Sequence, residues 1–246
     1  MHLQGTEHRP WPLPDGPWAM AMNWHDLLFA HWPIPSAEMK PVIPAGMELD
    51  TFDGTAWLGV VPFRMSGVRP RGIPVLPWFS VFPELNVRTY VTAGGKPGVY
   101  FFSLDAANPV AVAVARKRYH LPYFRAAMRC RDSSGWVDYS SRRTHQGAPA
   151  AEFRARYRPT GEAFQAPRGT IEYFLTERYC LYTTSGAGVC RAEIHHAPWP
   201  LQPAAAQIKV NTMAQAHGLH LPDVPPLLHF AKRLDVVAWT LKQVSA

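Results

Sequence analysis

The sequence contains none of the short motifs that assign a chemistry by themselves. It has no His-Glu-x-x-His, no Gly-x-Ser-x-Gly, no Gly-x-Gly-x-x-Gly and no phosphate-binding loop. Eleven histidines are present, but His195 and His196 are adjacent, so in a strand they would point to opposite faces. We therefore expect neither a bound metal ion nor a cofactor.

Cysteine is scarce as well. Cys130, Cys180 and Cys190 form no Cys-x-x-Cys pair, and three residues cannot all be joined in disulfides. Free cysteines of this kind are most often core residues. No apolar run reaches about 18 residues, and the chain does not open on a charged and then apolar segment. We expect a cytoplasmic, reduced protein with no membrane partner.

Lysine is rare among the basic residues, with six lysines against 19 arginines in a chain of formal net charge +7. The densest basic stretch is Arg116 to Arg158, where ten arginines and Lys117 stand against three acidic residues. In "FRAAMRCR" and "EFRARYR" the arginines alternate with apolar residues, which predicts solvated outer faces on strands with apolar inner faces. Aromatic residues do not interleave as they do where bases stack. Nucleic acid is therefore a minor alternative, and we do not expect it as a partner.

Strand signals dominate the rest of the chain. Pro (25), Trp (9), Tyr (9) and Phe (12) favour strands and turns over long helices. The clearest hairpin signal is Asp53-Gly54, and the one convincing helix runs from about Asn108 to Arg118. We expect a mainly β (α+β) protein, with a flexible N-terminal arm at residues 1–17 and a single barrel domain at residues 18–246. The oligomeric state is left open, a homo-oligomer included.

The segment "ELNVRTYV" carries the candidate site. Alternate side chains of a strand share a face. One face of this strand therefore carries four polar side chains, those of Glu84, Asn86, Arg88 and Tyr90. The other face carries Leu85, Val87, Thr89 and Val91. The polar face lies either against water or against a cavity, and the two readings lead to different proteins.

Several segments in order resemble one family. They are "LLFAHWPIP", "LDTFDGTAWLGVVPF", "ELNVRTYV", "GVYFFSLDA", "LPY" and "LTERYCLY". They are similar to the YqjF-like uncharacterised bacterial family of the acetoacetate decarboxylase-like superfamily, over about Trp24 to Trp239. The resemblance implies two antiparallel sheets curled into a cone-like barrel with a few peripheral helices and an internal pocket. In such a barrel the polar face of "ELNVRTYV" would line the pocket.

The enzymes that give the superfamily its name form a Schiff base between a lysine and a β-keto acid. The matching segment here is "ARKRYHLPYFRA", in which Tyr123 and Phe124 stand where two lysines would be. This departure removes the nucleophilic amine. Lys117 stands between two arginines, whose charges lower an amine's pKa, but it also lies at a helix end that favours cations.

Two hypotheses for the pocket follow. In the first, the barrel binds a small organic carboxylate or carbonyl compound and performs lyase-like acid–base chemistry without a Schiff base. Arg88 and Arg178 would bind the anion, with Asn86 and Tyr90 as further substrate contacts. Glu84 would be the base and Tyr123 a proton donor. In the second, the same scaffold is a non-catalytic small-molecule binder. A buried Arg88 would also need a counter-charge, for which we expect Glu177.

The missing lysine generates a direct prediction. Treatment with borohydride in the presence of a β-keto acid should leave no covalent adduct on the protein. Mass spectrometry of the intact protein and of its peptides measures this. A stable adduct mapped to Lys117 would contradict the proposed match of "ARKRYHLPYFRA" and restore Schiff-base chemistry.

Overall fold

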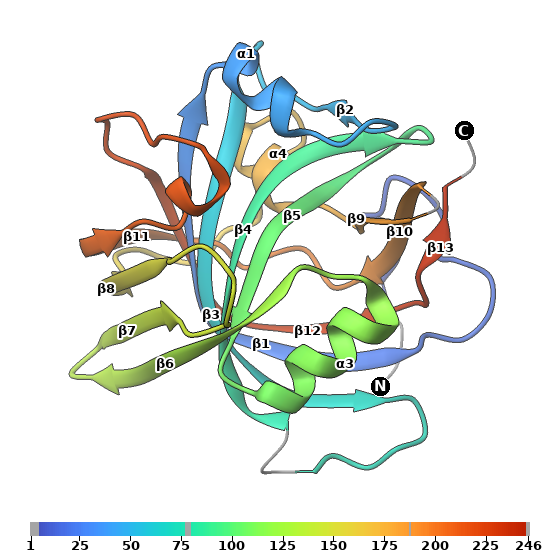
Figure 1. Ribbon diagram of the computed structural model, residues 1–246, viewed down its shortest axis with the longest axis horizontal. Helices are drawn as coiled ribbons and strands as arrows, with labels where there is room; N and C mark the ends of the chain where they lie inside the picture. The colour runs from blue at the N-terminus through green and yellow to red at the C-terminus, as the bar shows by residue number, and fades with distance from the viewer. Residues whose placement is uncertain (1–4, 77–79, 187, 245–246) are drawn as a thin grey trace.

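The computed structural model describes residues 5–76, 80–186 and 188–244. Most of these residues lie in strands, which join into one 13-stranded sheet (Figure 1). The strands are β1 (Met20–Ile34), β2 (Glu48–Leu49), β3 (Ala56–Pro70), β4 (Phe82–Ala93), β5 (Lys96–Ala106), β6 (Tyr123–Ser133), β7 (Trp136–Arg143), β8 (Glu152–Pro159), β9 (Cys180–Ser185), β10 (Gly188–His195), β11 (Gln202–Asn211), β12 (Leu227–Ala238) and β13 (Lys242–Gln243). The predicted β-rich barrel is confirmed.

The sheet closes on itself twice. Its order is β13-β10-β9-β5-β6-β7-β8-β11-β12-β1-β3-β4-β2, and further pairings join β4 to β5 and β10 to β12. The first closure makes a ring that includes β6, β7, β8 and β11, which we call the packed ring. The second makes a ring that includes β9 and β10, which we call the cavity ring. Strands β1, β3, β4, β5 and β12 belong to both rings.

The sheet is mixed, where the sequence analysis expected two antiparallel sheets. Strand β5 pairs in parallel with β6 and with β9. Between β5 and β6 the chain crosses over through helix α3 (Pro109–Tyr119), and such a crossover returns it parallel to the strand it left. The remaining pairings between named strands are antiparallel, as between β4 and β5 across the Gly94-Gly95 turn.

Helices are short and peripheral. They are α1 (Ser36–Met39), η1 (Lys40–Val42), α3, α4 (Ile171–Thr176) and η2 (Gln215–His217). Helix α3 is the predicted one. The side chain of Asn108 accepts hydrogen bonds from the backbone N–H groups of Val110 and Ala111, both at 3.0 Å, which caps the helix start. No helix among the described residues is long and apolar enough to span a membrane.

The packed ring is filled by side chains. Tyr139, Phe153, Tyr157 and Phe230 are 0–2% exposed and lie in one cluster with aliphatic residues of the shared strands. The Tyr139 hydroxyl donates to the backbone carbonyl of Glu84 at 2.7 Å, which fastens this core to strand β4. Of the free cysteines, Cys180 and Cys190 are buried, as expected for core residues, whereas Cys130 is only half-buried.

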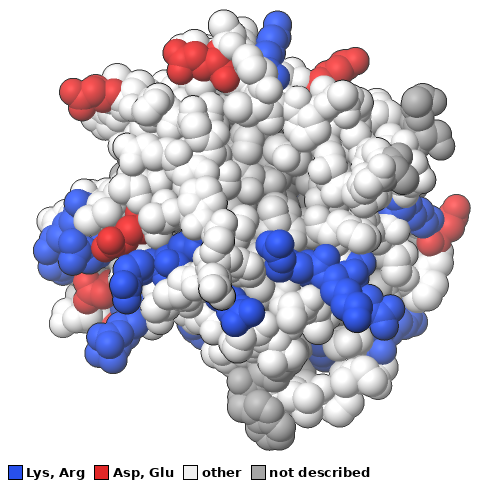
Figure 2. Space-filling model, in the orientation of Figure 1, with Lys and Arg blue, Asp and Glu red and all other residues white. Residues whose placement is uncertain are grey.

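The outer face of the packed ring carries the arginines. Arg125, Arg129 and Arg131 of β6 are exposed, while Ala126 is buried, so the predicted alternation is confirmed. On β8 the guanidinium groups of Arg156 and Arg158 lie over the ring of Trp136 at 4.3 and 4.6 Å. Figure 2 shows basic side chains gathered across the lower half of this view, over α3 and the strand ends at the left.

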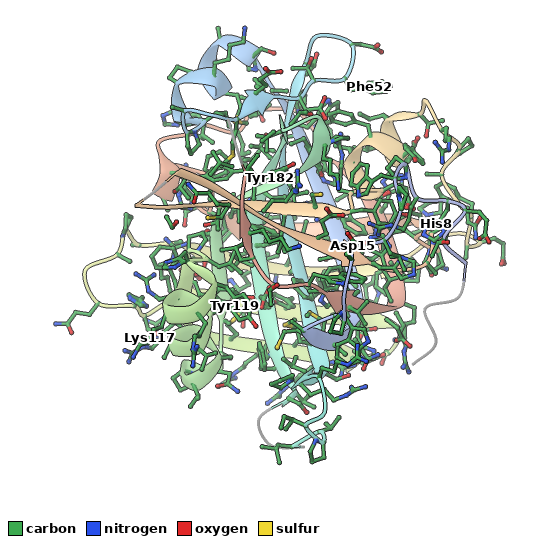
Figure 3. All side chains as sticks on the ribbon, turned by 90° about the vertical axis from the view of Figure 1, so that its right-hand side faces the viewer. His8, Asp15, Phe52, Lys117, Tyr119 and Tyr182 are labelled. Atoms are coloured by element: carbon green, nitrogen blue, oxygen red, sulfur yellow. The ribbon has the colours of Figure 1, made fainter. Side chains whose placement is uncertain are left out.

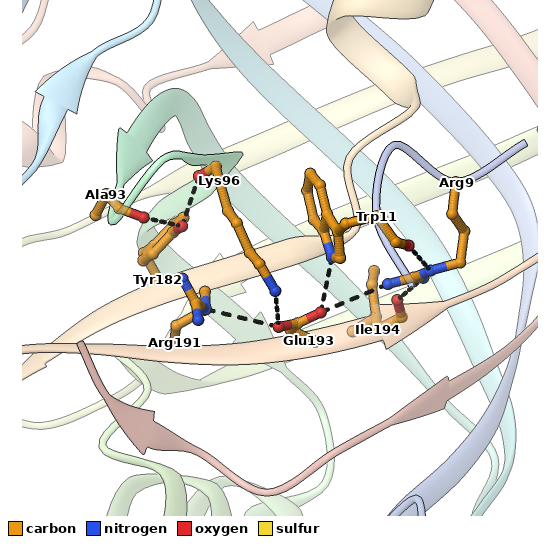
Figure 4. A network of polar contacts seen from close by, with 8 residues as sticks. All are labelled: Arg9, Trp11, Ala93, Lys96, Tyr182, Arg191, Glu193 and Ile194. Atoms are coloured by element: carbon orange, nitrogen blue, oxygen red, sulfur yellow. Dashed lines mark hydrogen bonds and ion pairs between the residues drawn. The ribbon is translucent and has the colours of Figure 1, made fainter. Parts of the chain in front are cut away.

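The described part of the N-terminal arm is fastened to strand β10 (Figure 4). Arg9 is only 6% exposed, and its Nη1 donates to the backbone carbonyl of Ile194 at 2.6 Å. The Glu193 carboxylate accepts from Trp11 Nε1 at 2.8 Å and from Lys96 Nζ at 2.6 Å. The sequence analysis expected residues 1–17 to be flexible. Arg9 and Trp11 attach this segment to the barrel, while Pro10, Pro12 and residues 15–17 are exposed.

A buried ion pair beside the shared strands generates a stability prediction. Arg143 Nε and Nη2 donate to the two carboxylate oxygens of Asp105 at 2.8 and 2.9 Å, and both side chains are almost fully buried. Arg143→Met would leave Asp105 buried without a cation, so we expect the free energy of unfolding to fall by about 3–5 kcal/mol. Arg129→Met, at an exposed position of β6, should change it by at most about 0.5 kcal/mol. Urea denaturation of both variants measures this, and equal losses would contradict the role of the pair.

Candidate ligand-binding cavity

The cavity ring encloses a cavity of about 200 Å³. Strands β1, β3, β4, β5, β9, β10 and β12 contribute to its wall, and helix α3 covers one side. Most lining side chains are apolar, and several of them belong to a single buried cluster that includes Leu27, Val61, Phe63, Phe82 and Ile194. The cavity wall is therefore mainly apolar, with only a few polar side chains.

Strand β4 separates this chamber from the packed ring, so both of its faces are buried. Leu85 and Val87 lie in the core of the packed ring. Glu84, Asn86 and Arg88 line the cavity and are 2%, 6% and 9% exposed. The polar face of "ELNVRTYV" therefore lies against a cavity and not against water.

Arg88 is a buried cation with few partners. Its Nη2 donates to the backbone carbonyl of Leu175 at 3.1 Å, and its guanidinium lies over the rings of Phe29 and Tyr90 at 5.3 and 5.7 Å. Its Nε has no hydrogen-bond partner. No carboxylate in the described residues lies within ion-pair distance of it. An arginine has five N–H donors, and the Tyr90 hydroxyl is also within reach of this guanidinium, but neither contact supplies a counter-charge.

The prediction that Glu177 balances Arg88 is wrong. The Glu177 carboxylate accepts a hydrogen bond from the Tyr179 hydroxyl at 2.5 Å and another from the backbone N–H of Trp199 at 2.8 Å. These two donors, one close to Glu177 in the chain and one from the segment after β10, satisfy the carboxylate without Arg88. The positive charge of Arg88 is thus left facing the cavity.

Glu84 and Tyr123 form a second polar pair in the wall. The Tyr123 hydroxyl donates to Glu84 Oε2 at 2.9 Å, and both residues line the cavity. Burial raises the pKa of Glu84 to about 8, despite the hydrogen bond from Tyr123, which lowers it. Burial, together with the neighbouring Glu84, raises the pKa of Tyr123 well above its ordinary value. Glu84 is therefore mostly a neutral acid at pH 7, whereas the sequence hypothesis made it the base.

Four residues of the cavity wall carry a polar atom that has no hydrogen-bond partner among the described residues and is itself covered by neighbouring protein atoms. These atoms are Asn86 Oδ1, Trp24 Nε1, Trp199 Nε1 and His196 Nε2. Burial lowers the pKa of His196 to about 4, so its ring is neutral. Its Nδ1 lies 2.7 Å from the backbone carbonyl of Ala197 and takes the donor role, since a carbonyl only accepts. Nε2 then carries no proton, and this atom is itself buried.

Two predicted ligand contacts are already engaged. Tyr90 does not line the cavity, because its hydroxyl is buried between the backbone carbonyl of Leu175 at 2.8 Å and His31 Nε2 at 2.7 Å. Arg178 does line the cavity, but its Nη1 donates to Asp50 Oδ2 at 2.5 Å and its Nε to Phe174 O at 2.6 Å. Its charge is therefore already paired.

No lysine is among the residues that line the cavity. Figure 3 shows Tyr119 directed from α3 toward the barrel and Lys117 directed away from it. The described residues also contain no group of three or more His, Cys, Asp or Glu side chains that could hold a metal ion. The chemistry available in the cavity wall is hydrogen bonding, ion pairing and proton transfer.

The fold is that of the acetoacetate decarboxylase-like proteins. It is similar to acetoacetate decarboxylase from Legionella pneumophila, with a TM-score of 0.62 and 12% identity, over 98% of this chain and 93% of that chain. It is equally similar to the enduracididine biosynthesis enzyme MppR in complex with pyruvate, with a TM-score of 0.62 and 10% identity, over 94% of this chain and 91% of that chain. At these identities the likeness shows the fold alone.

The chain belongs to the DUF2071 family of uncharacterised conserved proteins, whose model matches residues 21–235. It is 48% identical over 233 residues to the uncharacterised protein YqjF of Bacillus subtilis, which covers 95% of this chain and 96% of that protein. The family resemblance read from the sequence motifs is confirmed.

Sequence reasoning located one strand of the cavity but missed the residues opposite it. Trp24, His196 and Trp199 come from segments far from β4 in the sequence, and only the ring closure brings them together. The adjacent histidines of "HHAPW" were weighed only as metal ligands and set aside, so the place of His196 in the cavity wall was not predicted.

The raised pKa of Glu84 predicts a pH dependence of stability. A carboxyl group whose pKa rises on folding stabilises the native state fully below its unfolded pKa of about 4.5, and this stability is lost as the pH rises toward 8. Over that window the group should lower the free energy of unfolding by about 1.4 kcal/mol per pH unit. Glu84→Gln removes this contribution and keeps an acceptor for Tyr123.

The measurement is urea denaturation of wild type and Glu84→Gln at several pH values from 4.5 to 8. The stability of the variant should rise relative to wild type as the pH increases, since every other group titrates alike in both proteins. A difference that stays constant with pH would show that Glu84 ionises with an ordinary pKa.

Proposed function

We propose that the cavity binds a small organic carboxylate and that the Glu84–Tyr123 pair performs proton transfer on it. The observation that carries this proposal is Arg88, a cation that is 9% exposed, faces a cavity and has no carboxylate partner among the described residues. An unpaired charge in such a place costs several kcal/mol. A bound carboxylate would offset that cost through charge-assisted hydrogen bonds to the guanidinium fork.

The roles of the polar groups follow from their positions in the cavity wall and from their protonation. Arg88 binds the carboxylate, and Asn86, which lies between Arg88 and Glu84 on the same face of β4, contacts the adjacent part of the ligand. Glu84 is neutral at pH 7, so it first donates its proton to the carbonyl oxygen of a keto ligand. Tyr123 donates to Glu84 Oε2 and so stabilises the carboxylate that remains. This carboxylate then takes a proton from the carbon between the carbonyl and the ligand carboxylate, which leaves the enol and restores the Glu84 acid, and the reverse steps return the keto form.

A non-catalytic binder on the same scaffold is the second candidate. The hydrogen bond from Arg88 to a backbone carbonyl and the apolar wall serve binding without any reaction. The two candidates differ in Glu84 alone. Catalysis requires that a proton reach the ligand from this group, whereas simple binding does not.

The test of binding uses matched probes and variants. Pentanoate and the uncharged pentanamide are titrated into wild type, Arg88→Met and the exposed control Arg129→Met by calorimetry. Pentanoate should bind wild type and the control alike and Arg88→Met at least tenfold more weakly, and pentanamide should bind none of them well. Equal binding of pentanoate to wild type and Arg88→Met would contradict the proposal.

The same variant tests whether Arg88 serves stability. Replacing an unpaired buried cation by an apolar side chain of similar length is often neutral or stabilising. We therefore expect the free energy of unfolding of Arg88→Met to lie within about 1 kcal/mol of wild type or above it. A loss of more than about 3 kcal/mol would show that Arg88 holds the fold together.

Catalysis is tested with a 3-keto acid in deuterated buffer. Wild type should catalyse deuterium incorporation at the carbon between the carbonyl and the carboxylate, as followed by proton NMR, and Glu84→Gln should bind the acid but catalyse no exchange. Binding without exchange by wild type would favour the non-catalytic candidate.

A further inference from the structure

The polar groups are not spread evenly over the cavity wall. Along β4 the inward side chains run from Arg88 through Asn86 and Glu84 to Phe82. Beyond Glu84 the wall is apolar: Met65 of β3 pairs with Phe82, and Met20, Met22, Val68, Val236 and Leu241 also line this part of the cavity. The cavity therefore has one cationic end and one apolar end.

The apolar end leads toward the surface. The lining residues there include Val68 at the end of β3 and Leu241 after β12, both partly exposed, and Val114 of α3, which is 47% exposed. Phe82 stands six positions before Arg88, and six positions span about 20 Å along an extended strand. A ligand bound at Arg88 and reaching the covering helix would thus follow a long apolar corridor.

From these observations, and resting on the proposed function, we infer that the ligand is an aliphatic carboxylate. Its head group binds Arg88, and its chain lies in the corridor toward α3. A head group alone would leave the apolar wall against water. Each methylene that the corridor buries should tighten binding by roughly threefold to fourfold. The inference thus adds a chain to the head group that Arg88 selects.

The test is a chain-length series of butanoate, octanoate and dodecanoate, titrated into wild type and Arg88→Met by calorimetry. We expect octanoate to bind wild type at least tenfold more tightly than butanoate, and every member to bind Arg88→Met at least tenfold more weakly. Octylamine, which has the same chain with the opposite charge, should not bind.

Two variants of helix α3 localise the chain. Ala115 lines the corridor, whereas Ala113 is exposed on the other side of the same helix. Ala115→Phe should weaken dodecanoate at least tenfold and leave butanoate within about twofold of wild type, while Ala113→Phe should change neither. Circular dichroism and thermal unfolding establish that both variants are folded.

The outcomes separate this inference from the proposed function. If butanoate binds through Arg88 but affinity does not rise with chain length, the aliphatic chain is wrong and the carboxylate site stands. If affinity rises with chain length but is unchanged in Arg88→Met and Ala115→Phe, binding occurs elsewhere and the inference fails. If no carboxylate of any length binds, the proposed function fails and this inference with it.

Discussion

The structure depends on the burial of both faces of strand β4. A strand whose inner and outer faces are both covered must place every side chain against protein or an enclosed space. On one face Leu85 and Val87 fill the packed ring. On the other, Glu84, Asn86 and Arg88 enter the cavity ring. The double closure of the sheet, through β4–β5 and β10–β12, is what encloses both sides at once.

This constraint determines the chemistry of the cavity. Carboxyl and guanidinium groups that would be ordinary at a surface become a neutral acid and an unpaired cation once they are taken out of water. The phenol of Tyr139, on the packed side, donates to the backbone carbonyl of Glu84 and so joins the packed core to the strand that carries these groups. The cavity wall therefore combines a large apolar surface with a few polar side chains at one strand.

Much of this architecture could be predicted from local patterns in the sequence. Alternation in "ELNVRTYV" and "EFRARYR" predicted which side chains share a face, and the Asn108 cap predicted α3, since both depend on neighbours in the sequence. Partners that are distant in the sequence could not be predicted from these local patterns. Glu177 was expected to pair with Arg88, but it is satisfied by Tyr179 and the backbone of Trp199.

The placement of Tyr90 shows the same limit. Tyr90 shares a face with Arg88 in the sequence pattern. Its hydroxyl, however, donates a hydrogen bond to the backbone carbonyl of Leu175 at the end of α4, and Tyr90 does not line the cavity. A period of two fixes the face of a strand, but not where along that face an enclosed space ends. That boundary depends on which loop covers the strand.

The central claim is that Arg88 is the anchor of an anionic ligand inside the cavity. A crystal structure of the protein with octanoate tests it most directly. The proposal predicts a carboxylate within about 3 Å of the terminal guanidinium nitrogens of Arg88 and a chain that runs past Glu84 toward Val114. Octanoate bound with its carboxylate at the α3 end, or an empty cavity in which Arg88 pairs with a protein carboxylate, would contradict it.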